Sequence, residues 1–212
     1  MVTHHRGPDL GRAEQHPQAL SDRYVRYIRI DRAAMTCKPD RGLTLPPRPF
    51  FWAVGVAPPP RHGQMSGKEP RQRLGLQETD PRGGDLVRVW VPCANLLVGD
   101  GHGRQGGGEV CVNAPEMGLT GTFTFIPHRR GDGPAHSCPR AETPSHPITL
   151  GLNEDMDLRQ ALREMIDPAV SPTALTRVQA YQLCSLAVDS RVAYTVNGDK
   201  SVNGILVKGV LL

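Results

Sequence analysis

Two carboxylate side chains and one imidazole lie close together in the sequence, within a glycine-rich stretch. Asp100 and His102 are two positions apart, and Glu109 follows seven positions later across a run of glycines. Residues two apart in an extended segment point to the same side, and glycines let the backbone fold back. Imidazole and carboxylates together suit a divalent cation such as zinc. Such a cation polarises an amide carbonyl and lowers the pKa of a bound water, so the stretch suggests a metal-dependent hydrolytic site.

These glycines allow two other interpretations. Residues 101–106 formally match the dinucleotide pattern Gly-x-Gly-x-x-Gly, which requires a strand before it and a helix after it. The residues that follow, Glu-Val-Cys-Val at 109–112, favour a strand, and this argues against a dinucleotide site. A solvated glycine-rich turn with incidental polar residues is the remaining alternative, and spacing alone favours it over a metal site.

Hydrophobic patterning predicts the elements that would position these residues. Strands are predicted at residues 24–30, 50–56, 86–91, 94–98, 110–112, 121–126, 191–196 and 205–211. In the strand at 121–126, strict alternation places Phe123 and Phe125 on one face. Asn197 and Gly198 form a hairpin-turn signal between the last two strands.

Two helices are predicted in the C-terminal part. Residues 157–166 carry an apolar stripe with helical spacing, begin at an aspartate cap and are expected to end before Pro168. The second helix is predicted at 176–188, where Thr176 and Gln179 form a capping box.

Composition limits the classes of protein that fit. The 212 residues suffice for one large domain or two small ones, and 23 glycines and 20 prolines favour a loop-rich, β-rich chain. The net charge of +4 is spread out, and this argues against a nucleic-acid partner. Five cysteines without a closely spaced pair suggest free thiols in a reducing cytosol. No apolar run predicts a signal peptide or a membrane span, so we expect a cytoplasmic protein. Residues 1–22 are expected to form a disordered tail, and residues 61–84 a long loop.

Several stretches together resemble the acetamidase/formamidase family of amide hydrolases. The matching stretches, in the family's order, are residues 48–60, 98–111, 113–125 (starting Asn-Ala-Pro-Glu), 141–146, 151–155, 160–165 and 180–189. Together they cover about residues 24–60 and 85–212. The resemblance implies a mainly β fold with a β-sandwich-like core and an α+β C-terminal part carrying two helices. Residues 23–212 would form this region, with the family's N-terminal portion missing.

The resemblance also implies a reaction and a set of site residues. The reaction is hydrolysis of a short linear amide, such as formamide or acetamide, to a carboxylate and ammonia. The metal would be zinc, with calcium as the alternative, and the chain would form a homo-oligomer. The implied residues are Asp100, His102 and Glu109 as metal ligands, Glu116 as general acid/base, and Gln105 and Gly101 as substrate-binding residues. For Glu116, an exposed charge between strands is the competing interpretation.

The chain departs from the family pattern at places that bear on activity. Gly107 stands where the family usually has an aspartate, and Lys-Ser-Val-Asn at 200–203 replaces Lys-Gly-Val-His. The segment at 72–81 does not resemble the family either. These departures leave two alternatives open: an inactive truncated paralogue or fragment with only a structural or oligomeric role, and a binding module that retained the pocket and lost the chemistry.

Overall fold

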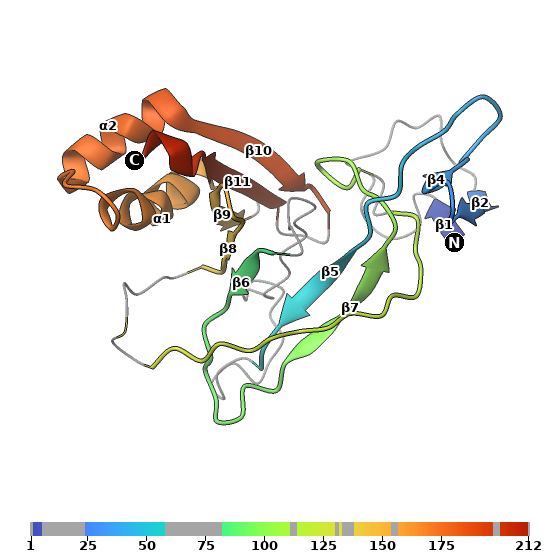
Figure 1. Cartoon of the computed structure of the whole chain (residues 1–212), viewed down its shortest axis with the longest axis horizontal. Helices are drawn as coiled ribbons and strands as arrows, with labels where there is room; N and C mark the ends of the chain where they lie inside the picture. Colours follow the sequence, from blue (N-terminus) through green and yellow to red (C-terminus); the bar gives the residue numbers. More distant parts are fainter. Residues whose placement is uncertain are drawn as a thin grey trace.

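The fold was analysed in a computed structural model, which describes residues 2–5, 24–57, 82–110, 114–129, 132, 138–153, 157–196 and 200–211. The N-terminal strands are β1 (Val2–His5), β2 (Tyr24–Tyr27), β3 (Ile30–Asp31) and β4 (Thr36–Cys37), and the central strands are β5 (Phe50–Gly55), β6 (Gly84–Leu86) and β7 (Leu97–His102). The C-terminal elements are β8 (Arg140–Glu142), β9 (Pro147–Asn153), α1 (Leu158–Val170), α2 (Arg177–Ala187), β10 (Val188–Tyr194), β11 (Lys200–Leu206) and the 3-10 helix η4 (Lys208–Val210). Strands predominate, and the predicted mainly β fold with two C-terminal helices is confirmed (Figure 1).

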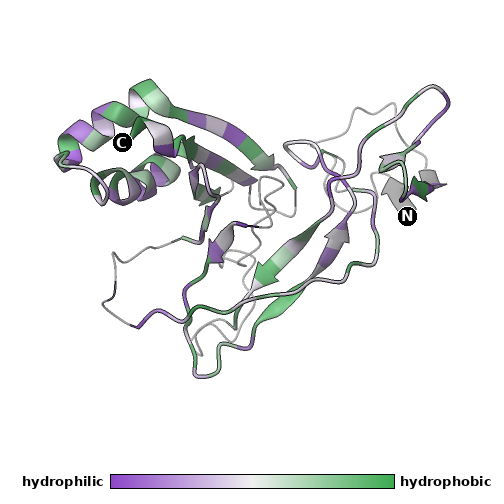
Figure 2. Cartoon of the chain, viewed as in Figure 1, coloured by the Kyte–Doolittle hydropathy of each residue, from purple (hydrophilic) through white to green (hydrophobic). Residues whose placement is uncertain are grey.

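A five-stranded antiparallel sheet forms the centre of the C-terminal part. Its order is β10-β11-β9-β8-β6, and β11 pairs along its whole length with β9. Both helices cover one face of this sheet (Figure 1). Gly151 permits the close approach of α1, because a Cβ there would lie 1.8 Å from the carbonyl oxygen of Asp157. The helix–sheet core consists of Met165, Ala169, Ala180, Cys184 and Leu206, and hydrophobic residues recur along both helices (Figure 2).

The two helices begin where the sequence predicts. Asp157 caps α1 by accepting a hydrogen bond from the backbone N–H of Gln160. Thr176 and Gln179 form the predicted capping box of α2. The predicted end of α1 is wrong, because the helix continues through Pro168 to Val170. The fixed φ of proline is itself helical, and the extension beyond Ile166 brings Ala169 into the core, where its side chain is fully buried.

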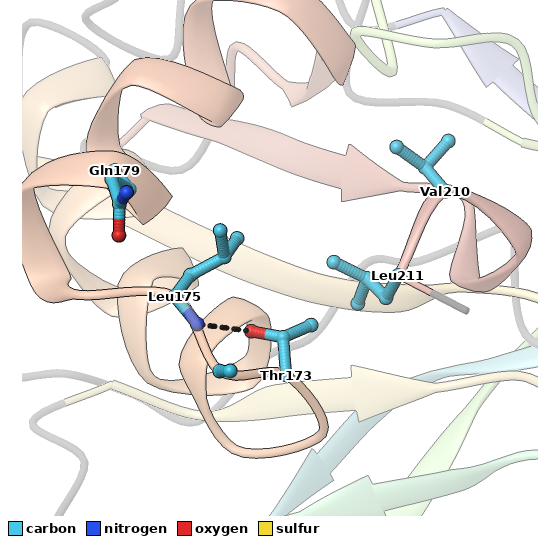
Figure 3. A pocket seen from close by; sticks show the side chains of 6 residues that line it. Thr173, Leu175, Gln179, Val210 and Leu211 are labelled. Carbon is cyan, nitrogen blue, oxygen red and sulfur yellow. Dashed lines mark hydrogen bonds between the residues drawn. The ribbon is translucent and has the colours of Figure 1, made fainter.

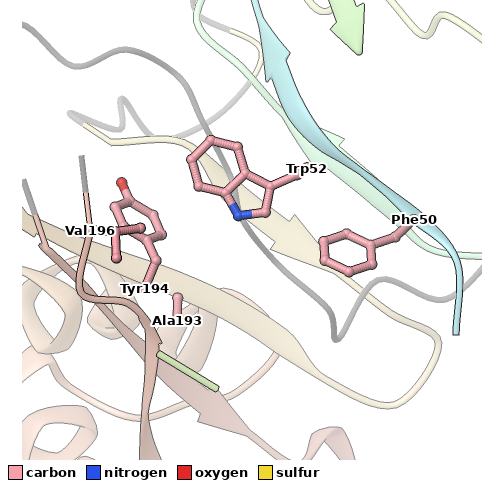
Figure 4. Packing of buried hydrophobic residues seen from close by; sticks show 5 residues of the cluster. All are labelled: Phe50, Trp52, Ala193, Tyr194 and Val196. Carbon is pink, nitrogen blue, oxygen red and sulfur yellow. The ribbon is translucent and has the colours of Figure 1, made fainter. Parts of the chain in front are cut away.

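The other face of the five-stranded sheet packs against β5, and the two layers form a sandwich. Phe50 and Trp52 of β5 join Ala193, Tyr194 and Val196 in one buried cluster, shown in Figure 4. The rings of Trp52 and Tyr194 lie 5.5 Å apart between centroids. Val54 extends the contact by packing against a second cluster on β8, β9 and β11. β5 thereby joins the C-terminal part to β7, its partner strand.

Several predicted strands differ from those observed. The strand predicted at 86–91 is replaced by β6, which ends at Leu86. The strand predicted at 94–98 begins later and runs on through the glycines to His102 as β7. Residues 121–126 form no strand, and Phe123 and Phe125 are exposed. The last strand starts at Lys200, earlier than predicted.

Some predictions fall largely outside the described residues. These are the strand at 110–112, most of the loop at 61–84 and the turn at 197–198. Within the predicted tail, residues 2–5 form β1, which pairs antiparallel with β2. Among the described residues, no helix is both long and apolar enough to cross a lipid bilayer.

Candidate metal site

The site is assembled on β7 by backbone pairing along both of its edges. On one edge β7 pairs antiparallel with β5, which sets His102 opposite Phe50. On the other edge the N–H of Gly103 donates to the carbonyl of Pro115, and the N–H of Met117 donates to that of Gly101, both at 2.8 Å. These two bonds set Glu116 directly opposite His102. Residues remote in sequence therefore meet on one short ribbon.

Three side chains converge on this ribbon. The Nε2 atom of His102 lies 3.4 Å from a carboxylate oxygen of Asp100 and 3.6 Å from one of Glu116. One ligand atom from each of the three residues lies within 4.8 Å of the others. The sequence predicts that Asp100 and His102 share a side of an extended segment, and their proximity agrees with that prediction.

The spacing of these atoms fits a tetrahedral ion. Two atoms that each lie about 2.1 Å from a tetrahedral zinc ion are about 3.4 Å apart. The separations of 3.4 Å and 3.6 Å match that value. The donor set of one imidazole and two carboxylates also fits zinc better than calcium, since calcium takes six to eight oxygen ligands. The residues present therefore fit the implied metal.

The imidazole is buried, whereas the carboxylates reach solvent. His102 is 1% exposed, and its ring lies 5.5 Å from that of Phe50 and 6.0 Å from that of Trp52 between centroids. The side chains of Asp100 and Glu116 are 44% and 36% exposed. An ion held by these groups would have one apolar wall and one side open to a ligand.

The surroundings of Glu116 raise the pKa of its carboxyl group. Burial raises the pKa of Glu116 above its ordinary value, and the adjacent Asp100 carboxylate raises it further, while His102 acts in the opposite direction. A nearby cation would reverse this effect, because an opposite charge stabilises the carboxylate. The two acids are therefore arranged in a way that a positive charge between them would stabilise.

Asp100 adopts a backbone conformation that L-residues rarely occupy. Its φ is +60°, in the left-handed region, which costs roughly 1–2 kcal/mol for a residue other than glycine. Strain of this kind persists where the surroundings over-determine the backbone, and it often marks functional sites. Here the pairing of β7 with β5 supplies that constraint.

Glu109, predicted as the third metal ligand, is not part of the three-residue group. It lies in the glycine-rich loop, and its side chain is buried. This loop is attached to β10, since Gly108 bonds through its N–H to the carbonyl of Ala193 and through its carbonyl to the N–H of Thr195. Gly107, the position of the absent aspartate, is exposed in the same loop.

The two predicted substrate-binding residues lie next to the site. A Cβ at Gly101 would stand 2.3 Å from the carbonyl oxygen of Met117, so glycine is needed there for the strand pairing. Gln105 is 6% exposed, and its side-chain oxygen lies 2.9 Å from Nδ1 of His102. Their contact with a substrate stays a prediction.

A pocket of about 430 Å³ lies elsewhere, between the α1–α2 connection and η4 (Figure 3). It is lined by Thr173, Ala174, Leu175, Gln179, Val210 and Leu211. None of these side chains is an acid, a base or a metal ligand, so we assign it no chemistry.

Comparison with solved structures identifies the architecture. An acetamidase from Yersinia enterocolitica matches with a TM-score of 0.69 and 24% identity over 90% of this chain. An acetamidase from Bacillus halodurans matches with a TM-score of 0.71 and 23% identity over 99%. A predicted acetamidase/formamidase from the thermophile Thermoanaerobacter tengcongensis matches with a TM-score of 0.70 and 19% identity over 92% of this chain. This chain has the acetamidase fold.

The acetamidase fold is present here in a shorter chain. The matches span 57%, 68% and 64% of the lengths of the three neighbours, in the order given. No protein-family model matches the sequence, and comparison with curated proteins gives no match.

Proposed function

We propose that this chain is a divergent relative of the acetamidase/formamidase family and a metal-dependent hydrolase of short linear amides. The observation that carries the proposal is the grouping of Asp100, His102 and Glu116 with the spacing of a tetrahedral ion. The names of the three solved neighbours support the substrate class. The products would be a carboxylate and ammonia.

The same three residues would hold the metal, with zinc as the first choice. Nε2 of His102 would supply a neutral donor, and the two carboxylates would balance the charge of the ion. A bound divalent ion would polarise the amide carbonyl and lower the pKa of a bound water. We assign Glu116 as the third ligand in place of Glu109, because its oxygen faces the same imidazole nitrogen as that of Asp100.

The acid/base role predicted for Glu116 from the sequence is the competing assignment. Burial raises the pKa of Glu116, which is the direction expected for a general acid/base. Glu116→Gln separates the two roles, because an amide cannot take up the proton and is a poorer ligand than a carboxylate. Loss of both zinc affinity and turnover supports the ligand role. Loss of turnover with zinc affinity kept supports the acid/base role.

The test of the proposal measures zinc binding and ammonia release together. Purified chain is titrated with zinc by calorimetry and then assayed for ammonia release from formamide and acetamide, with and without the metal. The double variant Asp100→Ala/His102→Ala removes two ligands, and Asp189→Ala, at an exposed position on β10, serves as the matched control. We expect stoichiometric zinc binding and zinc-dependent turnover in the control and neither in the double variant.

Two outcomes would change the conclusion. Zinc binding and amide binding without turnover would support the binding-module alternative, in line with glycine at position 107. Equal zinc binding by the double variant and the control would remove the metal site. A homo-oligomeric state and a cytoplasmic location stay predictions.

A further inference from the structure

We propose that Gln105 is a positioning residue that fixes the hydrogen of His102 on Nδ1 and so directs the lone pair of Nε2 towards the metal position. The inference deepens the proposed function and rests on it for the identity of the metal site. The side chain of Gln105 is buried, and both ends of its carboxamide have hydrogen-bond partners. Gln105 is 6% exposed and lies three residues after His102.

The orientation of the carboxamide follows from the partner at its far end. The nitrogen of the Gln105 amide donates to the backbone carbonyl of Ala193 at 3.4 Å. A carbonyl oxygen can only accept a hydrogen bond, so the NH₂ group must face Ala193. The amide oxygen then faces His102, where it lies 2.9 Å from Nδ1.

This orientation determines which ring nitrogen carries the hydrogen. The amide oxygen of Gln105 has no hydrogen to donate, and so Nδ1 of His102 must be the donor. In the neutral ring the other nitrogen, Nε2, then has the free lone pair. Nε2 is the atom that lies 3.4 Å from Asp100 and 3.6 Å from Glu116. A metal binds only the unprotonated nitrogen, and the hydrogen bond at the other nitrogen selects it.

The anchor of Gln105 lies on a strand of the five-stranded sheet. Ala193 belongs to β10 and also accepts a hydrogen bond from the N–H of Gly108 at 3.1 Å. Gln105 thus connects the imidazole to the edge of the five-stranded sheet through one side chain. Both ends of its carboxamide are engaged within the protein, and this favours the positioning role over the substrate contact predicted from the sequence.

The experiment reads the tautomer directly in the metal-free chain. Long-range ¹H–¹⁵N correlation spectra distinguish Nδ1–H rings, Nε2–H rings and doubly protonated rings, and they are recorded at about pH 8, above the ordinary pKa of a histidine side chain. The chain has eight histidines, so a His102→Gln spectrum identifies the signals of His102. Spectra are compared for the wild type, Gln105→Leu, Gln105→Glu and the exposed control Gln182→Leu. Zinc affinity and the kinetic constants for amide hydrolysis are measured on the same four proteins.

We expect an Nδ1–H ring in the wild type, in Gln182→Leu and in Gln105→Glu, whose carboxylate still accepts from Nδ1. Gln105→Leu is expected to lose this preference and to bind zinc about 10–100-fold more weakly, the usual effect of removing such a partner. Retention of zinc affinity in Gln105→Glu would show that the acceptor matters more than the side-chain shape.

The outcomes separate this inference from the proposed function. An Nδ1–H ring that is lost in Gln105→Leu, in a protein that binds no zinc, supports the positioning role and refutes the metal site. Zinc binding with an unchanged ring and unchanged affinity in Gln105→Leu overturns the positioning role. A raised KM at saturating zinc, with the tautomer unchanged, would also overturn it and assign Gln105 to the substrate.

Discussion

Replacement of Gly101 by alanine tests how the site is assembled. The added Cβ would lie 2.3 Å from the carbonyl oxygen of Met117, whereas real Cβ atoms essentially never approach closer than 3.0 Å. The backbone of Met117 must therefore retreat by at least about 0.7 Å to reach even that limit. That backbone forms the 2.8 Å bond from the N–H of Met117 to the carbonyl of Gly101, and Glu116 is its neighbour. The carboxylate of Glu116 would move with it.

The expected cost has two parts. Overpacking of this kind destabilises a fold by about 1–3 kcal/mol, measurable by urea denaturation of the metal-free chain. A metal site tolerates errors of only about 0.2 Å in its ligand distances, so we expect zinc affinity to fall at least about tenfold, or about 1.4 kcal/mol. Calorimetric titration with zinc checks the second effect.

The chain offers a matched control two residues away on the same strand. A Cβ at Gly99 would meet no atom within 4 Å, so Gly99→Ala should bind zinc like the wild type and keep its stability. If the Gly99 and Gly101 variants have the same zinc affinity and the same stability, the pairing of residues 115–117 with β7 is not what positions Glu116. The assembly of the site by strand pairing would then be refuted.

Three further predictions concern the C-terminal part. Asn203→Leu should raise the free energy of unfolding by about 1–3 kcal/mol, because both polar side-chain atoms of Asn203 are buried without a partner among the described residues. A lower free energy of unfolding, measured by denaturation, would mean that the Asn203 side chain is hydrogen-bonded in solution. Thr176→Ala should cost about 1 kcal/mol in the same measurement, since it removes the cap of α2, and no loss would contradict that role. Burial raises the pKa of the Cys184 thiol, so Cys184 should be alkylated more slowly than the exposed Cys93 at neutral pH. A mass-spectrometric time course measures both rates, and equal rates would contradict the burial of Cys184.

Elements set by local chemistry were predictable from the sequence. Each helix has an apolar stripe and a side-chain cap, Asp157 for α1 and Thr176 for α2. Within each helix, the cap and its partner lie only three residues apart in the sequence. β5 is a short apolar run, and the strand predicted at 50–56 matches it closely. These features depend on neighbours in the chain and so can be inferred without the fold.

Strands whose partners lie far away in the sequence were harder to predict. β7 runs through Gly99 and Gly101, which read as loop residues, because β5 supplies its hydrogen bonds. Residues 121–126 have ideal alternation but form no strand, since alternation indicates a half-buried surface and does not by itself supply a partner. Backbone pairing with a remote segment therefore determines whether each of these two stretches forms a strand.

In the candidate site too, the local relation was predictable from the sequence and the long-range contact was not. The i, i+2 spacing of Asp100 and His102 placed them together correctly, since that relation is local. The glycine-rich stretch and the family resemblance predict Glu109 as the third ligand. Glu116 instead reaches the group through the bridge between its own backbone and that of His102. The signal that could have found it is Gly101, because a glycine inside a strand often marks the close approach of another backbone.

The strained backbone of Asp100 ties these observations together. A left-handed residue within β7 is a local cost, and the ribbon formed by β7 and residues 115–117 exposes two carboxylates beside one buried imidazole. Glycine at position 100 would relieve the backbone strain there. Burial is the main cause of the raised pKa of Glu116, and the Asp100 carboxylate adds to it. A positive charge between the two acids would favour their ionised forms. The proposed ion would offset these local costs by stabilising the two carboxylates.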